Sequence, residues 1–305
     1  MLKYLKILKS MVTDESQWWR YVRATPALRL IPDKYYLKRW YRFKTGKELN
    51  LANPQSFNEK LQWLKLYDRN PEYSKMVDKY EVRQYIKEKI GEEHLIPLVG
   101  GPWEHFEDID FSKLPNQFVL KCTHDSGSVE ICKNLKNFDI EQVRKKFNYT
   151  LKRNYFYYGR EWPYKNVKPR IIAEKYMLED SGIEPRDYKV FNFNGEPRII
   201  QVDLDRFVNH RHNYYTPKWE FLDVYIDDPN DPKVVIECPS ELDELLKLAR
   251  KLSEGIPHLR TDFYIMKGRI FFGELTFFHA GGMGKFTPSK FERQMGDWLT
   301  LPNKR

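Results

Sequence analysis

The sequence has no long hydrophobic run. Its 305 residues mix apolar and polar positions closely, and Asn192 already breaks the apolar stretch that begins at Val190. A helix that spans a bilayer needs about 20 consecutive apolar residues. The sequence therefore predicts no transmembrane helix.

Residues 1–12 also lack the continuous apolar core and the small-residue cleavage site of a signal peptide, because Lys3, Lys6 and Lys9 interrupt the run. We expect a cytoplasmic protein. At helical spacing this basic and apolar segment suits peripheral contact with the inner face of an anionic membrane. A surface helix that packs on its own domain is the simpler explanation of the same pattern, and both interpretations stay open.

Cysteine is scarce, and glycine and proline show no period. Cys122, Cys132 and Cys238 form no CxxC pair, which excludes a disulfide framework and a zinc site of the usual spacing and fits a reduced compartment. The 15 glycines and 18 prolines are spread along the chain, so collagen-like and low-complexity structures are excluded as well.

Several functional signatures are missing too. The chain has neither the GxxxxGK[ST] of a P-loop nor the GxSxG of a serine hydrolase. Lysine and arginine number 52 against 43 acidic residues, a net charge of +9, which suits a polyanionic ligand. These basic residues are scattered and nucleic-acid signatures are absent, so we predict no nucleic-acid partner.

The sequence shows helical periodicity near the amino terminus. Apolar positions three and four apart predict helices before residue 75, and Ser56 followed by Glu59 is the capping box that begins one of them. A further helix is predicted from Lys75 to Ile90, ended by Gly91. We expect a helical region over residues 1–75.

Beyond residue 90 the pattern changes to short β-rich runs. Two of the junctions, Asn194-Gly195 and Lys267-Gly268, accept the positive φ of a tight hairpin. Helical patterns at 140–153 and 240–253 separate the strands. Antiparallel strands with intervening helices predict an α+β fold, with one mixed lobe over residues 76–185 and a second over 186–305.

One strand ends in a turn suited to phosphate. Lys121 lies in the apolar run FVLKCT, and the turn Ser126-Gly127-Ser128 follows it. Backbone N–H groups of such a turn can converge on phosphate oxygens, and a nearby lysine adds a mobile positive charge. An ordinary loop has the same composition, so the feature is informative only in combination.

A predicted hairpin gathers oxygen ligands. Asp262 enters one strand, Glu274 and Thr276 leave the other, and residues two apart on a strand share a face. Clustered carboxylate and hydroxyl oxygens suit Mg²⁺ held jointly by protein and substrate phosphates. A second interpretation, a charged strand rim, remains open. A third is a nucleotide-sugar glycosyltransferase that uses Asp203 and Asp205 as a metal-binding DxD.

Taken in order, these features resemble the ATP-grasp superfamily of carboxylate–amine ligases. VDKYEVR places Lys79 at the family's first phosphate lysine, and Lys121 falls on the second, followed by the flexible phosphate loop. Asp125 departs from the family pattern, where glycine is expected. A carboxylate beside phosphate is unfavourable unless it faces Mg²⁺ or a lysine.

The segment PRIIAEKYM is similar to the interlobe hinge of that superfamily. The resemblance implies that Glu174 opens the motif and that backbone groups of Lys175 and Met177 meet the adenine edge. It also implies that an acidic residue shortly after, Glu179 or Asp180, reaches the ribose.

The carboxylate hairpin falls on the family's Arg-x-Asp and Glu-x-Asn pairs. The resemblance implies that Asp262, Glu274 and Thr276 hold one or two Mg²⁺ ions, with threonine in place of the family's asparagine. It assigns catalytic roles on substrate and phosphate to Arg260, Lys189 and Arg206.

Longer segments, among them NPQSFNEKLQWLKLYDRNP and FFGELTFFHAGGMGKF, are similar to the ATP-grasp branch typified by the teichuronopeptide biosynthesis protein. The resemblance implies two lobes around a nucleotide cleft, ATP and Mg²⁺ as cofactors, and amide formation through an acyl phosphate. The expected partners are an acidic glycan or uronic-acid precursor of a bacterial surface polysaccharide and an amine, either an amino acid or an amino sugar. A kinase outcome, with phosphate passed to a hydroxyl, stays open.

Overall fold

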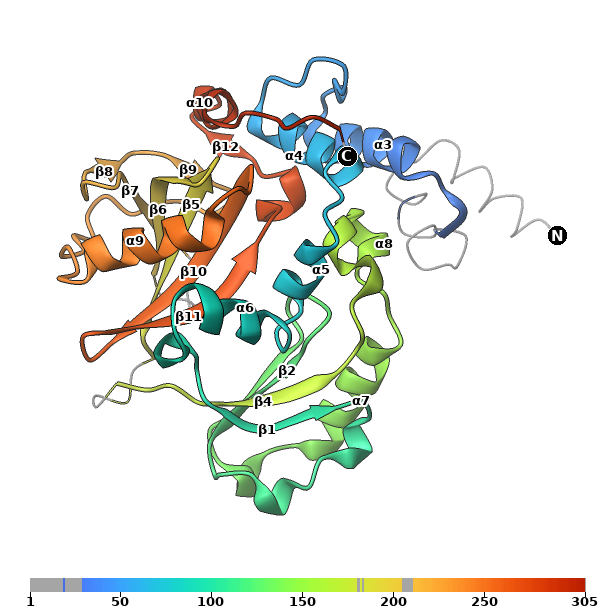
Figure 1. The fold of residues 1–305 in the computed structure, drawn as a ribbon, viewed down its shortest axis with the longest axis vertical. Coiled ribbons are helices and arrows are strands. Elements are labelled where there is room, and N and C mark those ends of the chain that lie inside the picture. Colours follow the sequence, from blue (N-terminus) through green and yellow to red (C-terminus); the bar gives the residue numbers. More distant parts are fainter. Residues whose placement is uncertain (1–18, 20–28, 180–181, 183, 205–210, 305) are drawn as a thin grey trace.

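The computed structural model describes residues 19, 29–179, 182, 184–204 and 211–304, and the account below concerns these (Figure 1). The expectations placed on residues 1–12, Asp180, Asp205 and Arg206 lie outside the described residues. Within the described part, no helix combines the length and the hydropathy that crossing a membrane requires.

Four antiparallel strands form the smaller sheet, at the bottom of Figure 1. Helix α7 (Ile140–Leu151) packs on it and closes a separate hydrophobic core. The strand order is β1 (Leu98–Trp103), β4 (Ile171–Lys175), β2 (Phe118–Cys122) and β3 (Val129–Cys132).

A larger antiparallel sheet follows in the sequence. Its strand order is β11 (Arg269–Thr276), β10 (His258–Met266), β5 (Arg186–Phe193), β6 (Glu196–Leu204), β7 (Arg211–Tyr215) and β8 (Phe221–Leu222). Helix α9 (Leu242–Ser253) covers one face, where even-numbered β5 residues such as Val190 meet its buried leucines. A short sheet of β9 (Tyr225–Ile226) and β12 (Phe286–Thr287) lies beside it.

Helices from both ends of the described chain cover part of the other face. The amino-terminal helices share one hydrophobic core with the six-stranded sheet, whereas the four-stranded sheet keeps its own. These helices are α3 (Asp33–Thr45), α4 (Phe57–Tyr67) and α5 (Glu72–Val77), and α10 (Lys290–Trp298) joins them from the carboxyl side. Helix α6 (Val82–Lys89) contacts α9, where the Tyr85 hydroxyl donates to the Leu252 carbonyl. Two shorter elements, α8 (Phe156–Gly159) and the 3₁₀ helix η6 (Trp162–Asn166), follow α7 and precede β4 in the sequence.

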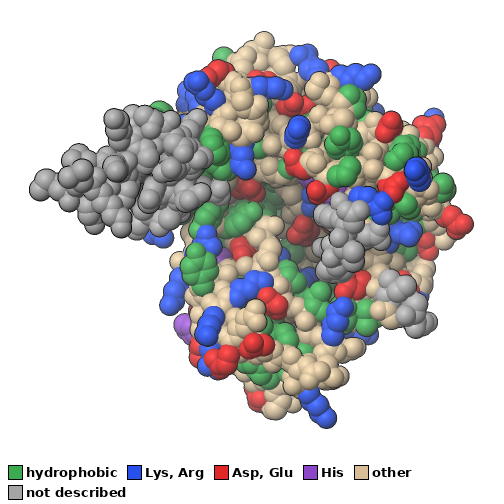
Figure 2. All heavy atoms as spheres, turned by 180° about the vertical axis from the view of Figure 1, so that it is seen from behind, with side chains coloured by type: hydrophobic (Ala, Val, Ile, Leu, Met, Phe, Trp, Pro, Cys, Tyr) green, Lys and Arg blue, Asp and Glu red, His purple; other side chains and the backbone are tan. Residues whose placement is uncertain are grey.

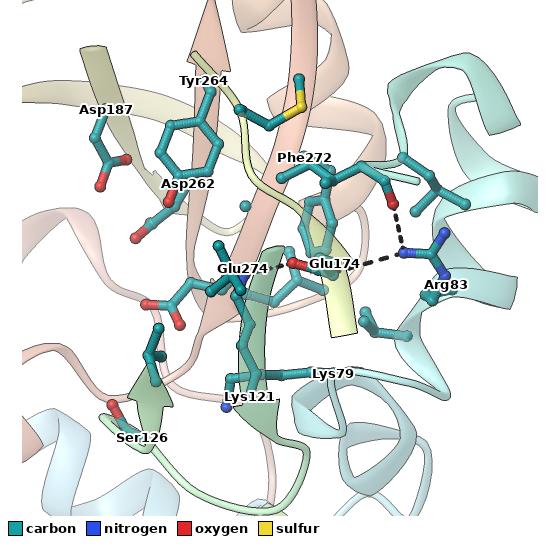
Figure 3. Close-up of a pocket in the computed structure, with 18 of the residues that line it drawn as sticks. Lys79, Arg83, Lys121, Ser126, Glu174, Asp187, Asp262, Tyr264, Phe272 and Glu274 are labelled. Carbon is teal, nitrogen blue, oxygen red and sulfur yellow. Dashed lines mark hydrogen bonds and ion pairs between the residues drawn. The ribbon is translucent and has the colours of Figure 1, made fainter. Parts of the chain in front are cut away.

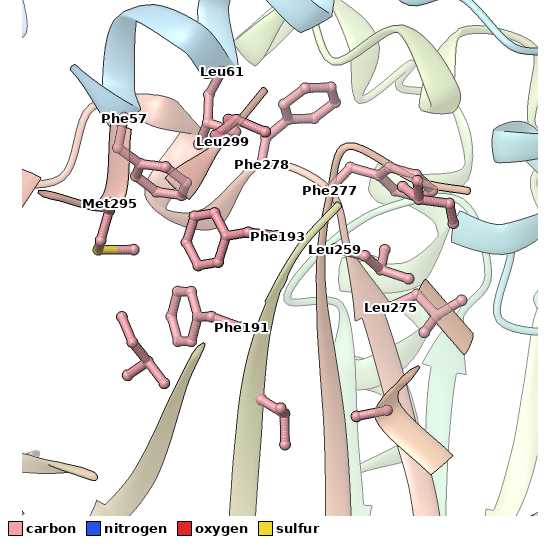
Figure 4. Packing of buried hydrophobic residues seen from close by; sticks show 14 of the residues in the cluster. Phe57, Leu61, Phe191, Phe193, Leu259, Leu275, Phe277, Phe278, Met295 and Leu299 are labelled. Atoms are coloured by element: carbon pink, nitrogen blue, oxygen red, sulfur yellow. The ribbon is translucent and has the colours of Figure 1, made fainter. Parts of the chain in front are cut away.

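One strand shows how this face is divided. Residues two apart on β5 point the same way, so Asp187, Lys189, Phe191 and Phe193 share a face. Phe191 and Phe193 are buried in the core (Figure 4), where Phe193 packs against Phe57 of α4 and Trp298 of α10. The side chains of Asp187 and Lys189 instead line a cleft between the two sheets. One strand therefore serves the core at one end and a cleft at the other.

Several sequence predictions about local structure are confirmed. Helix α4 begins after Ser56, whose hydroxyl accepts from the Glu59 N–H in a complete capping box. Both predicted hairpin turns have consecutive positive φ values, 50° and 85° at the first and 52° and 71° at the second. The α+β class with antiparallel sheets is confirmed, while the boundaries at 75 and 185 stay predictions.

The single helix predicted over residues 75–90 is wrong. The structure has two helices, with a break at residues 78–81. Within the break, the Asp78 carboxylate accepts from the N–H groups of Tyr80 and Glu81, and the Lys79 N–H donates to the Thr123 carbonyl next to the small sheet at 3.1 Å. The break is therefore fixed by a distant contact that helical periodicity cannot show.

Candidate active site

A cleft of about 560 Å³ lies between the two sheets (Figure 3). Figure 2 shows, on the opposite face from Figure 1, a hollow across the middle of the molecule with acidic side chains in it. Lys121 from β2 and Glu274 from β11 line the same cleft. The predicted phosphate strand and the predicted metal hairpin therefore meet. Ten predicted site residues line it: Lys79, Lys121, Ser126, Gly127, Glu174, Lys175, Met177, Lys189, Asp262 and Glu274.

Lys121 enters the cleft from the floor of the small sheet and is held by a carboxylate. Its Nζ lies 2.5 Å from Glu174 Oε2 on the neighbouring strand β4, and Arg83 Nη1 lies 3.7 Å from Glu174 Oε1. Burial alone would lower the pKa of Lys121, but the charges of Glu174, Tyr264 and Glu274 together raise it. The lysine is therefore positively charged at neutral pH.

Lys79 reaches the same region from the break between α5 and α6. Its ammonium group donates to the Asp125 carbonyl at the start of the predicted phosphate turn. The Asp125 carboxylate instead accepts from the Ser128 hydroxyl, and neither Asp125 nor Ser128 lines the cleft. The departure from the family pattern at Asp125 is thus accommodated, because this carboxylate is engaged inside the turn. Ser128 lies outside the cleft lining, in contrast to Ser126 and Gly127.

The predicted hinge forms an apolar corner of the cleft. Lys175, Tyr176 and Met177 line it next to aliphatic side chains that include Val119 and Ile131. The Lys175 N–H donates to the Pro97 carbonyl at 2.9 Å, so that N–H is not available to a nucleotide. A flat apolar slot beside charged groups suits a purine ring with a phosphate tail.

The carboxylate hairpin is aligned by strand register. Asp262 pairs with Glu274 across the β10–β11 ladder and with Lys189 on β5, so the three lie in one row across the sheet. A bulge after Asp262 places Gly273 where an added Cβ would lie only 3.1 Å from the Asp262 carbonyl oxygen. The bulge turns Glu274 toward the cleft, where 44% of its side chain is exposed.

Arg260 lies beneath these carboxylates. Its Nε and Nη2 donate to the two Asp262 oxygens, each at 2.7 Å, and Nη2 also lies 3.2 Å from Glu274 Oε1 and 3.1 Å from Thr276 Oγ1. Its Nη1 meets His279 Nδ1 at 2.7 Å. Arg260 and Thr276 do not line the cleft. Arg260 and Thr276 therefore orient the carboxylate groups of Asp262 and Glu274, and these two carboxylates line the cleft.

Lys189 is surrounded by acidic side chains. Its ammonium group contacts Asp187 and lies 2.9 Å from Asp203 Oδ2 and 3.8 Å from Asp262 Oδ2. Burial alone would lower its pKa, but these carboxylates raise it. Asp203 also accepts from Gln201 at 2.9 Å and lies 2.8 Å from His212 Nδ1. Asp203 is therefore part of the network of charged and polar side chains around Lys189.

Carboxylates gather at this end of the large sheet. Asp187, Asp203, Asp262 and Glu274 lie around Lys189 and Arg260. In the described part of the chain, no three His, Cys, Asp or Glu side chains are arranged as a complete metal site. Mg²⁺ commonly takes one or two carboxylates and completes its shell with water and phosphate, so Asp262 and Glu274 fit that ion.

Sequence reasoning missed three residues of the cleft. Arg83 orients Glu174, Tyr164 forms part of the wall, and Asp187 lies beside Lys189. Asp187 had a usable signal, because it stands two positions before Lys189 on a predicted strand and so shares its face. Tyr164 had none, since it lies in the short element η6.

The sequence of this chain matches a known protein family. A sequence profile described as TupA-like ATPgrasp matches residues 59–300. Searching the curated proteins gave no match.

Several solved structures match this chain at low sequence identity. D-alanine–D-alanine ligase from Bacillus anthracis is 16% identical, with a TM-score of 0.45, over 80% of this chain and 69% of that one. N5-carboxyaminoimidazole ribonucleotide synthetase in complex with ADP is 14% identical, with a TM-score of 0.43, over 71% and 49%. Biotin carboxylase from Campylobacter jejuni is 14% identical, with a TM-score of 0.41, over 80% and 49%. The chain thus spans between half and about two thirds of these proteins.

Proposed function

Because the chain belongs to the TupA-like ATPgrasp family and is an ATP-grasp enzyme, we propose that it joins a carboxylate to an amine at the expense of ATP. The reaction would produce an amide, ADP and inorganic phosphate. The observation that carries this proposal is that Lys121, Lys189, Asp262 and Glu274 line one cleft with an apolar corner. A nucleoside triphosphate needs basic groups for its phosphates, carboxylates for its metal ion and an apolar slot for its base.

The lysines would bind the phosphates. Lys121 approaches from the small sheet, Lys79 from the break between α5 and α6, and Lys189 from the large sheet, so a triphosphate in the cleft would touch cations on both sides. Ser126 and Gly127 add backbone N–H groups on the small-sheet side. Phosphoryl transfer needs mainly such positioning and charge neutralisation.

Asp262 and Glu274 would hold Mg²⁺, which neutralises phosphate charge when bound. Burial raises the pKa of Asp262 to about 7, against the opposing charges of Arg260 and Lys189. The bidentate contact with Arg260 fixes the orientation of this carboxylate. Glu274 is the more exposed partner and presents its oxygens directly to the cleft.

The two substrates can be named by chemical class. A uronic acid of a bacterial surface polysaccharide, or its precursor, would supply the carboxylate, and an amino acid or amino sugar would supply the amine. The resemblance to the teichuronopeptide branch and the net charge of +9 support an acidic glycan. The carboxylate attacks the γ-phosphate to give an acyl phosphate, and the amine then displaces phosphate and loses a proton.

The test is a product analysis. The protein is incubated with ATP, Mg²⁺, pooled uronic acids and pooled amines, and the mixture is examined by mass spectrometry. An amide, whose mass equals the two substrates minus one water, together with ADP, supports the ligase. A phosphorylated sugar without an amide would assign a kinase instead.

Nucleotide choice separates the ligase from a glycosyltransferase. A protein with a nucleotide cleft is stabilised against thermal unfolding by the nucleotide that it binds. ATP with Mg²⁺ is expected to raise the melting temperature, and UDP- or GDP-sugars are expected to leave it unchanged. The reverse pattern would contradict the proposed function.

A further inference from the structure

Aromatic and basic side chains gather at the carboxyl end of α7 and in the elements α8 and η6 that follow it. The 17 residues from Tyr149 to Lys165 include seven aromatic, four basic and one acidic residue, whereas aromatic residues make up 15% of the whole chain. The proposed phosphate and metal sites use none of these side chains. The composition of this segment therefore calls for a separate explanation.

Tyr164 of η6 brings the segment to the cleft. Its side chain lines the cleft together with Glu274 of the carboxylate hairpin. Burial raises the pKa of Tyr164, and the negative charges of Glu161 and Glu274 raise it further. The ring therefore lies near the carboxylate hairpin, where a substrate carboxylate has to meet the γ-phosphate.

Tyr155 stands beside Tyr164 and next to the phosphate turn. The two ring centroids are 4.8 Å apart, with the edge of one ring toward the face of the other. Burial and then the charge of Glu161 raise the pKa of Tyr155, while a hydrogen bond with the Ser126 side chain opposes the shift. Ser126 lines the cleft, so the two tyrosines form an aromatic wall beside the turn.

Asn154 fixes the two rings of this wall. Its Nδ2 donates to the Lys165 carbonyl at 2.8 Å, and its Oδ1 accepts from the Phe156 N–H at 3.1 Å. Asn154 immediately precedes Tyr155. Lys165 immediately follows Tyr164, so these bonds hold the two ring-bearing positions together. The wall is therefore formed before any substrate binds.

The wall continues outward to the surface. Tyr155 contacts Tyr158 at a centroid distance of 6.5 Å. The Arg153 guanidinium carbon lies 4.3 Å from the centroid of the Tyr158 ring and 4.7 Å from that of Tyr149, and Tyr149 is 62% exposed. From Tyr164 to Tyr149 these five side chains form an aromatic track that leads from the cleft to the surface.

Arg153 supplies the charge of this track. In the part of the chain that the structure describes, its half-buried guanidinium contacts two rings but forms neither an ion pair nor a side-chain hydrogen bond. A guanidinium binds a carboxylate through two parallel hydrogen bonds, and these donors remain free here. Lys152 and Lys165 are exposed and likewise form no ion pair with a described residue. The outer end of the track therefore suits an anion.

The chemistry of the track matches a chain of acidic sugars. A tyrosine ring offers an apolar face on which a sugar ring can stack, and its hydroxyl can hydrogen-bond. Several rings in succession cover more than one sugar, and each uronic acid unit carries a carboxylate that an arginine can bind. The segment's one acidic residue, Glu161, is balanced by Lys65, whose charge opposes the effect of burial on the Glu161 pKa.

We propose that the aromatic track binds an acidic oligosaccharide. The end unit enters the cleft at Tyr164, the chain follows Tyr155 and Tyr158, and Arg153 binds the carboxylate of an outer unit. The inference rests on the proposed function for calling this glycan the substrate. It makes that substrate a chain of several sugar units in place of a single uronic acid.

Binding to chains of different length and charge is the first test. Isothermal titration calorimetry is carried out with galacturonic acid, hexagalacturonate, a hyaluronan hexasaccharide and the neutral maltohexaose. At least one of the two acidic hexasaccharides should bind more tightly than the monomer by on the order of tenfold, as expected for one added contact with a charged group. Maltohexaose should bind no more tightly than the monomer. The proposal is overturned when neither acidic hexasaccharide exceeds the monomer or when maltohexaose equals them.

A matched pair of arginine variants locates the binding. Arg153→Gln removes the charge of the track, and Arg198→Gln removes that of an exposed arginine on β6 of the other sheet. Arg153→Gln should weaken binding of the acidic hexasaccharide on the order of tenfold, and Arg198→Gln should leave it unchanged. An equal loss in both variants would indicate attraction by net charge alone and would overturn the proposal.

An exposed ring covers the case in which Arg153→Gln does not unfold cooperatively. Tyr149→Ala changes a side chain that is 62% exposed, so the fold does not depend on it. The variant should bind the acidic hexasaccharide several-fold more weakly. Phe221→Ala, at a ring of β8 that is 39% exposed, is its control. A loss at Tyr149 no larger than at Phe221 would contradict the proposal.

Amide formation separates the track from the proposed function. With ATP, Mg²⁺ and pooled amines, the acidic hexasaccharide should give amide faster than galacturonic acid, and Arg153→Gln should reduce this advantage while Arg198→Gln keeps it. Equal rates from hexasaccharide and monomer would overturn the track and leave the ligase in place. Binding that depends on Arg153, without amide from any of these sugars, would contradict the proposed function and support the track as a glycan site.

Discussion

The two ends of strand β5 place the same face of one sheet in opposite environments. Phe191 and Phe193 are at most 2% exposed, whereas Asp187 and Lys189, four and two positions before Phe191, line the cleft. Side-chain alternation is continuous along the strand, and so is its register with β10. The difference comes from what covers the strand, so the apolar end carries stability and the charged end carries the proposed chemistry.

The charged end depends on the apolar end. Burying a phenylalanine side chain contributes about 1.5–3 kcal/mol, while the buried charges near Lys189 and Asp262 gain little net stability because their desolvation offsets their attraction. Packing of Phe193 against Phe57 and Trp298, with ring centroids 5.8 and 5.5 Å apart, holds the strand on which the charges are placed. Substitutions at the two ends should therefore have separable effects.

The largest effect is expected at the charged end. Lys121→Ala and Glu274→Gln should each abolish measurable ADP formation, a loss of at least about 10²–10³-fold, because preorganised charges on the phosphates are removed. Thermal unfolding should remain cooperative. Lys113→Ala, at a lysine whose side chain is 83% exposed, is the control and should retain full activity. Turnover in either site variant would withdraw the site assignment.

A substitution at the apolar end should do the reverse. Phe193→Ala should lower the free energy of unfolding by about 3–5 kcal/mol, since it leaves a cavity under α4. At a temperature where the variant is folded, ATP with Mg²⁺ should still raise its melting temperature. Phe221→Ala, at a ring that is 39% exposed, should cost far less. Loss of nucleotide binding in folded Phe193→Ala would show that the two ends are not separable.

The apolar end should also be sensitive to acid. Burial lowers the pKa of His258 to about 3, whereas an unfolded histidine titrates near 6.5, so the unfolded chain binds the extra proton between these values. Stability is therefore complete above pH 6.5 and falls as the pH decreases toward 3, by about 2 kcal/mol at pH 5 from this group. Denaturant unfolding at pH 7 and pH 5 measures the loss.

His258→Gln should remove that part of the pH dependence. The exposed His105→Gln serves as the control and should keep it. An equal loss on acidification in His258→Gln and in the unsubstituted protein would contradict the assignment of the effect to His258.

The smallest effect is expected at the start of α4, which covers the apolar end. Ser56→Ala removes the side-chain cap of this helix and should lower the free energy of unfolding by about 1 kcal/mol. Ser240→Ala, at an exposed serine before α9, should change it by less than about 0.5 kcal/mol. A loss at Ser56 no larger than at Ser240 would indicate that the cap adds nothing to the packing.

Local signals account for what could be predicted from the sequence. The capping box at Ser56 and the hairpin turns at Asn194-Gly195 and Lys267-Gly268 depend on neighbours in the chain, and the structure confirms them. The pairing of Asp262 with Glu274 follows from the second hairpin once its turn is known. These local elements account for the carboxylate hairpin.

Contacts between distant segments account for what could not. The break before Lys79 depends on the Thr123 carbonyl, and the buried ammonium group of Lys65 depends on the carbonyls of Gly159 and Gly281. Lys65 belongs to the helix predicted from Ser56, and nothing in its sequence neighbours indicates that it is buried. The burial of Arg260 below the carboxylates likewise depends on His279, nineteen positions later.

The most direct test of the central claim is a crystal structure of the protein with a non-hydrolysable ATP analogue and Mg²⁺. The account predicts the triphosphate between Lys121 and Lys189, the ion on Asp262 and Glu274, and the purine in the apolar corner at Met177. A nucleotide bound elsewhere, with this cleft filled only by solvent, would contradict it.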